Sequence, residues 1–179
     1  MAEPEALLRA GHVVELGFIQ TALEPIGYSS EINDPTDTTL VPELVVLLGD
    51  DDEGRIRSLR IGFVPEADEL TSTKLLHFYS PLPFTAAEGV GIDNLRAAVA
   101  IVNEHVAIGA FGVHNDASLY FRYLLAGGRG RFFDDDMVVE IVAFIDFHQE
   151  HFGDYLDGVC AGEVSVAVLA DVIAQAEAE

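Results

Sequence analysis

Residues 103–122, NEHVAIGAFGVHNDASLYFR, decide how this chain is expected to fold. The run begins at the end of a candidate helix, turns at a glycine and continues as an apolar strand that contains Phe111 and Val113. Asn115 and Asp116 are residue types that favour tight turns. The residues after them return with the period of two that is typical of a strand. The stretch therefore predicts a helix followed by a β-hairpin.

The same stretch contains polar residues that suggest a chemical site, namely Asn103, His105, His114 and Asp116. Strand alternation places His114 out of phase with the apolar residues of its strand. Asn103 suits a helix end and Asp116 suits the turn, so both have structural explanations. We therefore expect this hairpin to be structural and to carry no chemistry.

The charge of the chain is its strongest compositional feature. Its 179 residues contain 31 acidic and only 9 basic residues, which gives a formal net charge of −22. Nucleic-acid affinity depends on Lys and Arg at the phosphates, so we expect no nucleic acid and no membrane as partners. Two interpretations of the acidity remain open. It keeps a hydrophobic chain soluble or salt-tolerant, or it attracts a basic or aggregation-prone protein.

Length and cysteine usage favour one cytoplasmic domain over residues 1–179. Half of the residues are hydrophobic, which is enough for a substantial core. No apolar run approaches the about 18–20 residues of a membrane span, and the first residues lack the basic region of a secretory signal. The single cysteine, Cys160, excludes an internal disulfide and suits a reducing compartment.

Periodicity along the chain predicts an α+β fold with a mainly antiparallel sheet and helices packed mainly on one face. The first helix, residues 4–26, is expected to bury Leu7, Leu8, Val14, Phe18, Ile19 and Ala22. Strands are expected at residues 28–32, 43–49 and 55–64, and in a fourth run that Pro81 and Pro83 end near residue 79. Asp134, Asp135 and Asp136 are expected to cap a long helix, which Gly153 and Gly158 interrupt. A last helix, residues 164–176, is expected to bury Val168, Leu169, Val172 and Ile173.

The best candidate for a metal or catalytic centre is the cluster of Asp146, His148, His151 and Asp154. His148 and His151 are three residues apart, so they share one side of a helix and suit zinc together with a carboxylate. Histidines near a helix C-terminus also have a simpler role, since they interact favourably with the helix dipole. A metal-dependent hydrolase centred on His148 and His151 is therefore the alternative function.

Other motifs point to structure. The acidic run at residues 50–54, DDDEG, lacks the spacing of a calcium-binding EF-hand and is expected to be a solvated turn. The basic loop at residues 127–131, GGRGR, lacks the pattern of a phosphate-binding loop. Cys160 has no neighbouring histidine, which argues against a nucleophile. We expect no catalytic residue, no cofactor and no metal.

Residues 75–162 resemble the YbjN-like family, whose fold is similar to that of type III secretion chaperones. The matching features are LHFYSPLPF, the helix ending at Asn103, then Gly109, Phe111 and Val113, the Asn115–Asp116 turn, and LYFR at residues 119–122. The acidic cap of the next helix and the segment at Gly158 also match. The last helix and the GGRGR loop depart from the pattern, which leaves the contacts with partners open.

The resemblance implies a small acidic protein that is not an enzyme, forms a homodimer and binds another protein as a chaperone or adaptor. We expect the partner to contact an exposed sheet face or groove. Tyr120, Arg122 and Leu124 are the candidate contact residues, because they lie out of phase with the residues expected to face the core. The competing interpretation is that these three side chains pack beneath a helix or against the second subunit.

Overall fold

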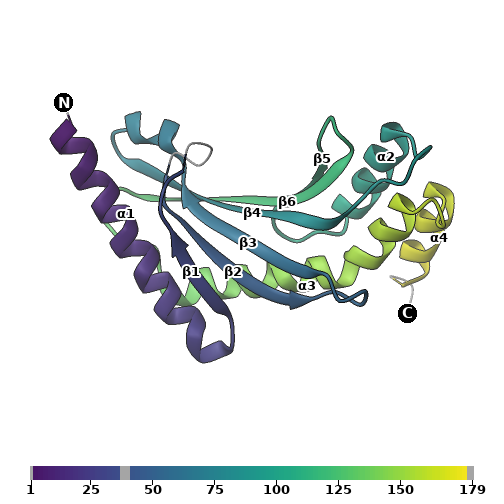
Figure 1. Cartoon of the computed structure of the whole chain (residues 1–179), viewed down its shortest axis with the longest axis horizontal. Helices are drawn as coiled ribbons and strands as arrows, with labels where there is room; N and C mark the ends of the chain where they lie inside the picture. The colour runs from purple at the N-terminus through teal and green to yellow at the C-terminus, as the bar shows by residue number, and fades with distance from the viewer. Residues whose placement is uncertain (1, 37–40, 177–179) are drawn as a thin grey trace. The chain divides into compact units, whose positions relative to one another are not determined.

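The structure, a computed structural model, describes residues 2–36 and 41–176 and confirms the α+β class. Six strands form one antiparallel sheet in the order β1-β2-β3-β4-β6-β5 (Figure 1). The strands are β1 (Ser29–Asn33), β2 (Glu43–Asp50), β3 (Ile56–Phe63), β4 (Thr73–Thr85), β5 (Ala110–Val113) and β6 (Ser118–Gly128). The helices are α1 (Ala2–Leu23), α2 (Ile92–Asn103), α3 (Asp135–Cys160) and α4 (Val166–Ala176), with short 3-10 turns η1 (Glu24–Ile26) and η2 (Pro65–Glu69). None of the described helices combines the length and apolar character of a membrane span.

The chain divides into two compact units, and each is assembled from three separate segments. Unit 1 comprises Met1–Gly49, Ser58–Tyr79 and Tyr123–Ala143. Unit 2 comprises Asp50–Arg57, Ser80–Arg122 and Phe144–Glu179. Both units therefore depend on chain segments that are distant in sequence.

Unit 1 is built around α1 and the antiparallel pairs of β1 with β2 and of β3 with β4. Ile32 lies opposite Leu44, and Ile61 lies opposite Phe78. Helix α1 packs against β1. Alternate residues of β3 face the core, and Leu59, Ile61 and Phe63 are all buried. Burial of such side chains contributes about 1.5–3 kcal/mol each, so this apolar layer is the main source of stability in unit 1.

A charged group lies inside the core of unit 1. The Glu15 carboxylate on α1 forms a buried ion pair with the Lys74 ammonium on β4, and the backbone N–H of Phe133 donates to Glu15 Oε1 over 2.7 Å. The Lys74 ammonium lies 4.7 Å from the centre of the Phe133 ring. Buried charges require this kind of pairing, because an unpaired one loses its hydration without compensation. The pair therefore fixes α1 against β4 and the segment that enters α3.

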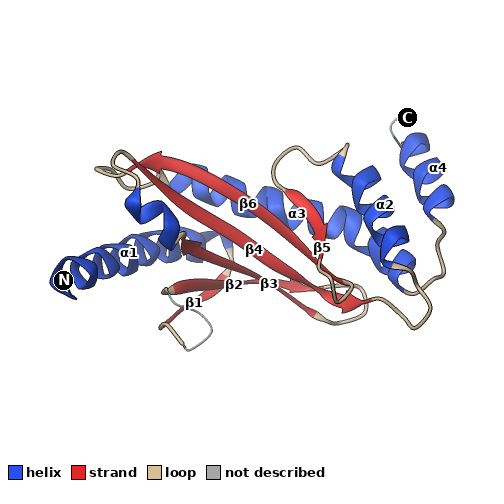
Figure 2. Ribbon diagram, turned by 90° about the horizontal axis from the view of Figure 1, so that it is seen from above, coloured by secondary structure: helices blue, strands red, loops and turns tan. Residues whose placement is uncertain are grey.

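Unit 2 contains the end of α2 and the hairpin that residues 103–122 were expected to form. Figure 2 shows α2 and α4 side by side, and α2 also packs against β5. Asn103 at the end of α2 accepts the Phe111 N–H at 2.8 Å and donates to the Phe111 carbonyl at 3.0 Å. Gly109 has a φ of 73°, and a Cβ there would lie 2.6 Å from the Phe121 ring. Asn103 and Gly109 thus join the helix to the hairpin, as a structural interpretation of this stretch requires.

The turn of this hairpin is also held by a side chain. Asp116 Oδ1 accepts hydrogen bonds from the Ser118 N–H at 3.1 Å and from the Ser118 hydroxyl at 2.7 Å. These bonds lower the pKa of Asp116. The role expected for Asp116 in the turn is confirmed.

The expected inward face of α1 is largely wrong. The structure buries His12, Glu15, Leu16, Ile19 and Leu23, whereas Leu7, Val14 and Phe18 are exposed. Only Ile19 of the expected inward residues is fully buried. The physical reason is the ion pair with Lys74, which turns two polar positions of α1 inward.

Two expected element ends are also wrong. β4 continues through Pro81 and Pro83 to Thr85. Because residues two apart point their N–H groups to the same side of a strand, both prolines lack donors on one edge only. Helix α3 continues through Gly153 and Gly158 to Cys160. Each glycine costs a helix only about 1 kcal/mol, less than the apolar burial of that segment contributes.

The ends of α3 and α4 agree in part with expectation. Asp134 caps α3, since its Oδ1 accepts the Met137 N–H at 3.1 Å. In α4, Leu169 and Ile173 are buried as expected, but Val168 is 51% exposed. The expected inward face of α4 is therefore correct at these two positions and wrong at Val168.

The buried ion pair predicts a large stability loss when only its cation is removed. Lys74→Met leaves the Glu15 carboxylate buried without a counter-charge, which is expected to lower the free energy of unfolding by about 3–5 kcal/mol. Urea denaturation measures this loss. Arg96→Met is the matched control, because Arg96 and Asp93 form an exposed pair, and it is expected to cost at most about 1 kcal/mol.

The double variant Glu15→Gln/Lys74→Met separates charge from packing. It leaves no buried charge, and the glutamine still accepts the Phe133 N–H, so most of the lost stability is expected to return. Equal, small losses for Lys74→Met and Arg96→Met would show that the buried pair has no special role.

Candidate functional site

Tyr120, Arg122 and Leu124, the predicted partner contacts, lie on β6 at positions that differ in exposure. Tyr120 is half-buried, and its ring lies 4.4 Å from that of His114. The same ring covers Gly112, where a Cβ would lie only 2.3 Å from it. Tyr120 thus has a packing role in the hairpin of unit 2. Arg122 and Leu124 are exposed, so they stay accessible to a partner.

The predicted histidine cluster separates into three environments within unit 2. His148 is 3% exposed, and its Nε2 accepts the Ala107 N–H at 3.2 Å. His151 is exposed and stacks on Phe147, with ring centres 5.6 Å apart. Asp146 forms an ion pair with Arg57 at 2.9 Å. No three His, Cys, Asp or Glu side chains in the described ranges are arranged to hold a metal ion.

A groove beside α1 in unit 1 has a volume of about 450 Å³. We call it the α1 groove. Leu7, Leu8, Gly11, His12, Glu15, Asp68, Lys74, Arg129, Gly130, Arg131 and Phe132 line it. Most of its cationic side chains are neutralised by acidic side chains of the same groove, since Lys74 pairs with Glu15 and Arg129 lies 3.5 Å from Asp68. The floor of the groove is therefore nearly neutral.

Large apolar side chains stand exposed on α1 and at Phe132, and two of them, Leu7 and Phe132, line the α1 groove. Leu7 is 76% exposed, Val14 53%, Phe18 49% and Phe132 57%. Leu7, Val14 and Phe18 are spaced by seven and four residues, so they share one side of the helix. The Phe18 and Phe132 rings lie 5.4 Å apart and join this side of α1 to the segment before α3. Contiguous exposed apolar side chains of this kind are typical of interaction surfaces.

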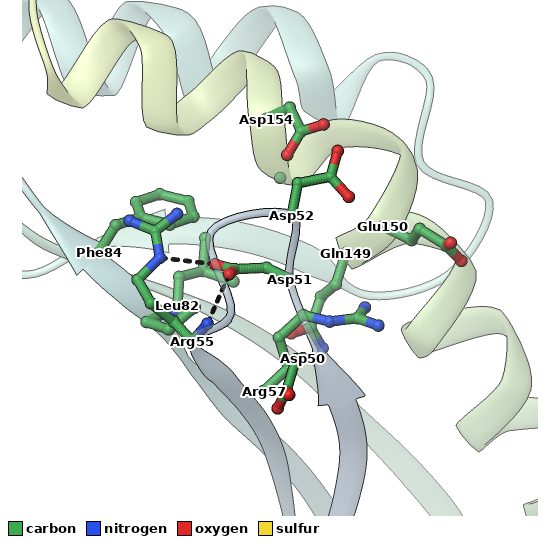
Figure 3. Close-up of a pocket in the computed structure, with 12 residues that line it drawn as sticks. Asp50, Asp51, Asp52, Arg55, Arg57, Leu82, Phe84, Gln149, Glu150 and Asp154 are labelled. Carbon is green, nitrogen blue, oxygen red and sulfur yellow. Dashed lines mark hydrogen bonds and ion pairs between the residues drawn. The ribbon is translucent and has the colours of Figure 1, made fainter.

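A second cavity, of about 150 Å³, lies in unit 2, and we call it the acid pocket (Figure 3). The β2–β3 turn supplies Asp50, Asp51 and Asp52, and the adjoining residues are Arg55 and Arg57. β4 supplies Leu82, Pro83 and Phe84, and α3 supplies Gln149, Glu150, Gly153 and Asp154. The acidic run that the sequence predicts to be a solvated turn thus forms one wall of a pocket.

Arg55 holds the turn of the acid pocket in place. Asp51 accepts the Arg55 backbone N–H at 2.8 Å and its Nε–H at 2.7 Å, as drawn in Figure 3. The other end of the guanidinium bonds to Asp157. Burial alone would raise the pKa of Asp51, but the hydrogen bonds from Arg55 outweigh it and lower that pKa. Asp51 and Arg55 are therefore structural, and both are satisfied.

Asp52 and Asp154 bring two carboxyl groups together in the acid pocket. Their carboxyl groups lie next to each other in Figure 3. Burial raises the pKa of Asp154, and the neighbouring charge of Asp52 raises it further. The sequence offered no signal for this pair, because its members lie on elements that only the fold brings together.

The buried histidine predicts a pH-dependent stability. Burial lowers the pKa of His148, and the charge of His151 lowers it further. The unfolded chain therefore takes up the proton first, so the stabilising contribution is complete above about pH 6.5 and is lost as the pH falls towards the lowered pKa.

His148→Gln removes this effect. At pH 7.5 the variant is expected to be less stable than the wild type by about 1–3 kcal/mol, because glutamine lacks the buried imidazole ring that packs against Phe121 and Phe152. The difference is expected to shrink at pH 5.5, and urea denaturation at both pH values measures it. His151→Gln, at an exposed position, is the control and is expected to change stability by less than about 0.5 kcal/mol. A His148→Gln difference that is constant with pH would contradict the assignment.

Comparison with known proteins assigns this chain to no family. No protein-family model matches the chain, and no curated protein sequence matches it. The resemblance of residues 75–162 to the YbjN-like family therefore stays a prediction from sequence motifs.

Proposed function

We propose that this protein is a non-enzymatic binding domain, a chaperone or adaptor that holds an apolar segment of a partner protein in the α1 groove. One observation carries the proposal: the exposed Leu7 and Phe132 line a cavity of about 450 Å³, and the exposed Phe18 packs against Phe132. An amphipathic segment that inserts its apolar side chains into a groove uses such a surface. The about 1.5–3 kcal/mol gained by burying each anchor is the source of affinity.

The chemistry of the partner follows from charge as well as from the apolar surface. The chain carries a formal charge of −22, whereas Lys74 and Arg129 of the groove are paired with Glu15 and Asp68. Long-range attraction therefore favours a basic partner, while the contact itself is apolar. The expected segment has at least two large apolar residues flanked by Lys or Arg.

The alternative function, a metal-dependent hydrolase, has less support. His148 Nε2 is occupied by the Ala107 N–H, and the His151 ring stacks on Phe147. Asp146 is engaged by Arg57. No observation brings these groups together around one reacting atom.

The proposal predicts which peptides bind and which substitution abolishes binding. Peptides selected from a random phage-displayed library on the intact protein are expected to contain two or more large apolar residues and a net positive charge. Phe18→Asp/Phe132→Asp removes two anchors, and such anchors contribute at least about 2 kcal/mol each. The dissociation constant, measured by fluorescence anisotropy, is therefore expected to rise at least about 500-fold.

A matched control distinguishes binding in the α1 groove from nonspecific hydrophobic binding elsewhere on the surface. Phe144→Asp/Phe147→Asp changes the net charge equally and removes two phenylalanines of similar exposure, 49% and 54%, from unit 2. It is expected to change the affinity by less than about twofold. Equal losses in the two double variants would contradict the role of the α1 groove.

The expected homodimer makes a second copy of this chain the competing occupant. Light scattering coupled to size exclusion measures the mass of the wild type and of the Phe18→Asp/Phe132→Asp variant. A dimer present only in the wild type would assign the α1 groove to self-association and overturn the partner-binding role. The proposal predicts the same mass for both proteins.

A further inference from the structure

The acid pocket of unit 2 has a surplus of negative charge that the described residues do not neutralise. Its two arginines are already engaged, Arg55 with Asp51 and Asp157 and Arg57 with Asp146. Among the residues that the structure describes, Asp52 and Asp154 form no ion pair with Lys or Arg, and their carboxyl groups lie next to each other in Figure 3. A ligand cation that reaches both groups would gain two carboxylate acceptors.

A second observation in the same pocket points to a ligand. Gln149 lines the pocket and is only 2% exposed. Its Oε1 accepts a hydrogen bond from the Ser80 hydroxyl at 2.9 Å, which fixes the amide. Its Nε2 is buried and has no hydrogen-bond partner among the described residues. Leaving a buried donor unpaired costs about 1–3 kcal/mol, so an acceptor carried by a ligand would gain a hydrogen bond here.

Size and wall chemistry narrow the ligand class. The volume of about 150 Å³ admits the end of one side chain or a small molecule. Leu82, Pro83 and Phe84 give one wall apolar atoms that suit an alkyl chain. No atom lies within 4 Å of the place where a Cβ of Gly153 would stand, which leaves the α3 side open. Calcium needs about six to eight oxygen ligands, and no group of three metal-ligating side chains occurs in the described ranges.

We propose that the acid pocket binds an organic cation, an ammonium or guanidinium group on an alkyl chain, whose molecule also carries a carbonyl or carboxylate oxygen. Asp52 and Asp154 hold the cation, and Gln149 Nε2 donates to the oxygen. The shared chemistry fits two sources, a free basic amino acid or an arginine or lysine within a protein segment. The pocket lies in unit 2 and does not depend on the proposed role of the α1 groove.

Calorimetric titration of the intact protein tests the site with four probes: arginine, N-acetyl-arginine amide, agmatine and calcium chloride. The first two carry both a cation and a carbonyl or carboxylate, and agmatine carries cations alone. Arginine or its blocked form is expected to bind, and agmatine at least about tenfold more weakly, because Gln149 Nε2 stays unpaired. A preference for arginine assigns a free ligand, and a preference for the blocked form assigns a protein segment. Calcium binding without any organic cation would overturn the proposal.

Variants locate the binding on the pocket. Asp52→Asn/Asp154→Asn is expected to lower the affinity for the probe at least about tenfold, because the cation loses charge-assisted hydrogen bonds. Glu104→Gln/Glu163→Gln changes the net charge equally at exposed positions of unit 2 and is expected to leave the affinity unchanged. An equal loss of affinity in both double variants would show that the probe is held only by general electrostatic attraction to an acidic protein, and it would overturn the proposal.

Gly153→Leu is a further variant that fills the pocket without altering any charge. Leucine is a better helix former than glycine, so folding is expected to be retained, and a thermal melt checks it. Binding is expected to be lost. Unchanged affinity in a folded Gly153→Leu protein would place the cation elsewhere and overturn the proposal.

Discussion

The buried carboxylate of Glu15 determines how unit 1 is assembled. It pairs with Lys74 on β4 and accepts the Phe133 N–H, so α1, the sheet and the entry to α3 meet at one charged group. An ion pair of this kind contributes less to stability than to the choice of one arrangement, since only one rotation of α1 satisfies both charges. That rotation turns Leu16 and Ile19 inward and leaves Leu7, Val14 and Phe18 in solvent. The α1 groove is a consequence of this constraint.

The two candidate sites depend on different physical terms. The α1 groove offers apolar area and few unsatisfied groups, so it suits a partner that gains affinity by burial. The acid pocket is small, and its unpaired Gln149 Nε2 and the adjacent carboxyl groups of Asp52 and Asp154 suit a ligand of definite charge and hydrogen-bonding pattern. The α1 groove therefore selects a partner by size and hydrophobicity, whereas the acid pocket selects a ligand by complementary polar atoms.

Sequence periodicity predicts local structure well in this chain. Alternation identifies the buried face of β3, and the roles of Asn103, Asp116 and Asp134 follow from their positions at a helix end, a turn and a cap. The inward face of α1 is not predictable in this way, because apolar residues surround the helix and the deciding partner, Lys74, is 59 residues away from Glu15. The acid pocket is hidden for the same reason, since Asp52 and Asp154 meet only after β3 and α3 have packed. Sequence periodicity therefore fails where a polar contact between residues distant in sequence determines which side chains are brought together or buried.

The orientation of α1 determines which of its side chains face the solvent, and the reaction rate of single introduced cysteines measures that orientation. The native Cys160 gives little background, because it is buried and burial raises the pKa of its thiol to about 11. Cysteine is introduced at Val14, Leu16, Phe18 or Ile19, and alkylation of each protein is followed by mass spectrometry. With α1 in this orientation, cysteines at positions 14 and 18 are expected to react fast. Cysteines at positions 16 and 19 are expected to react slowly, because their alkylation requires local opening. Protection at 14 and 18 with fast reaction at 16 would contradict this orientation.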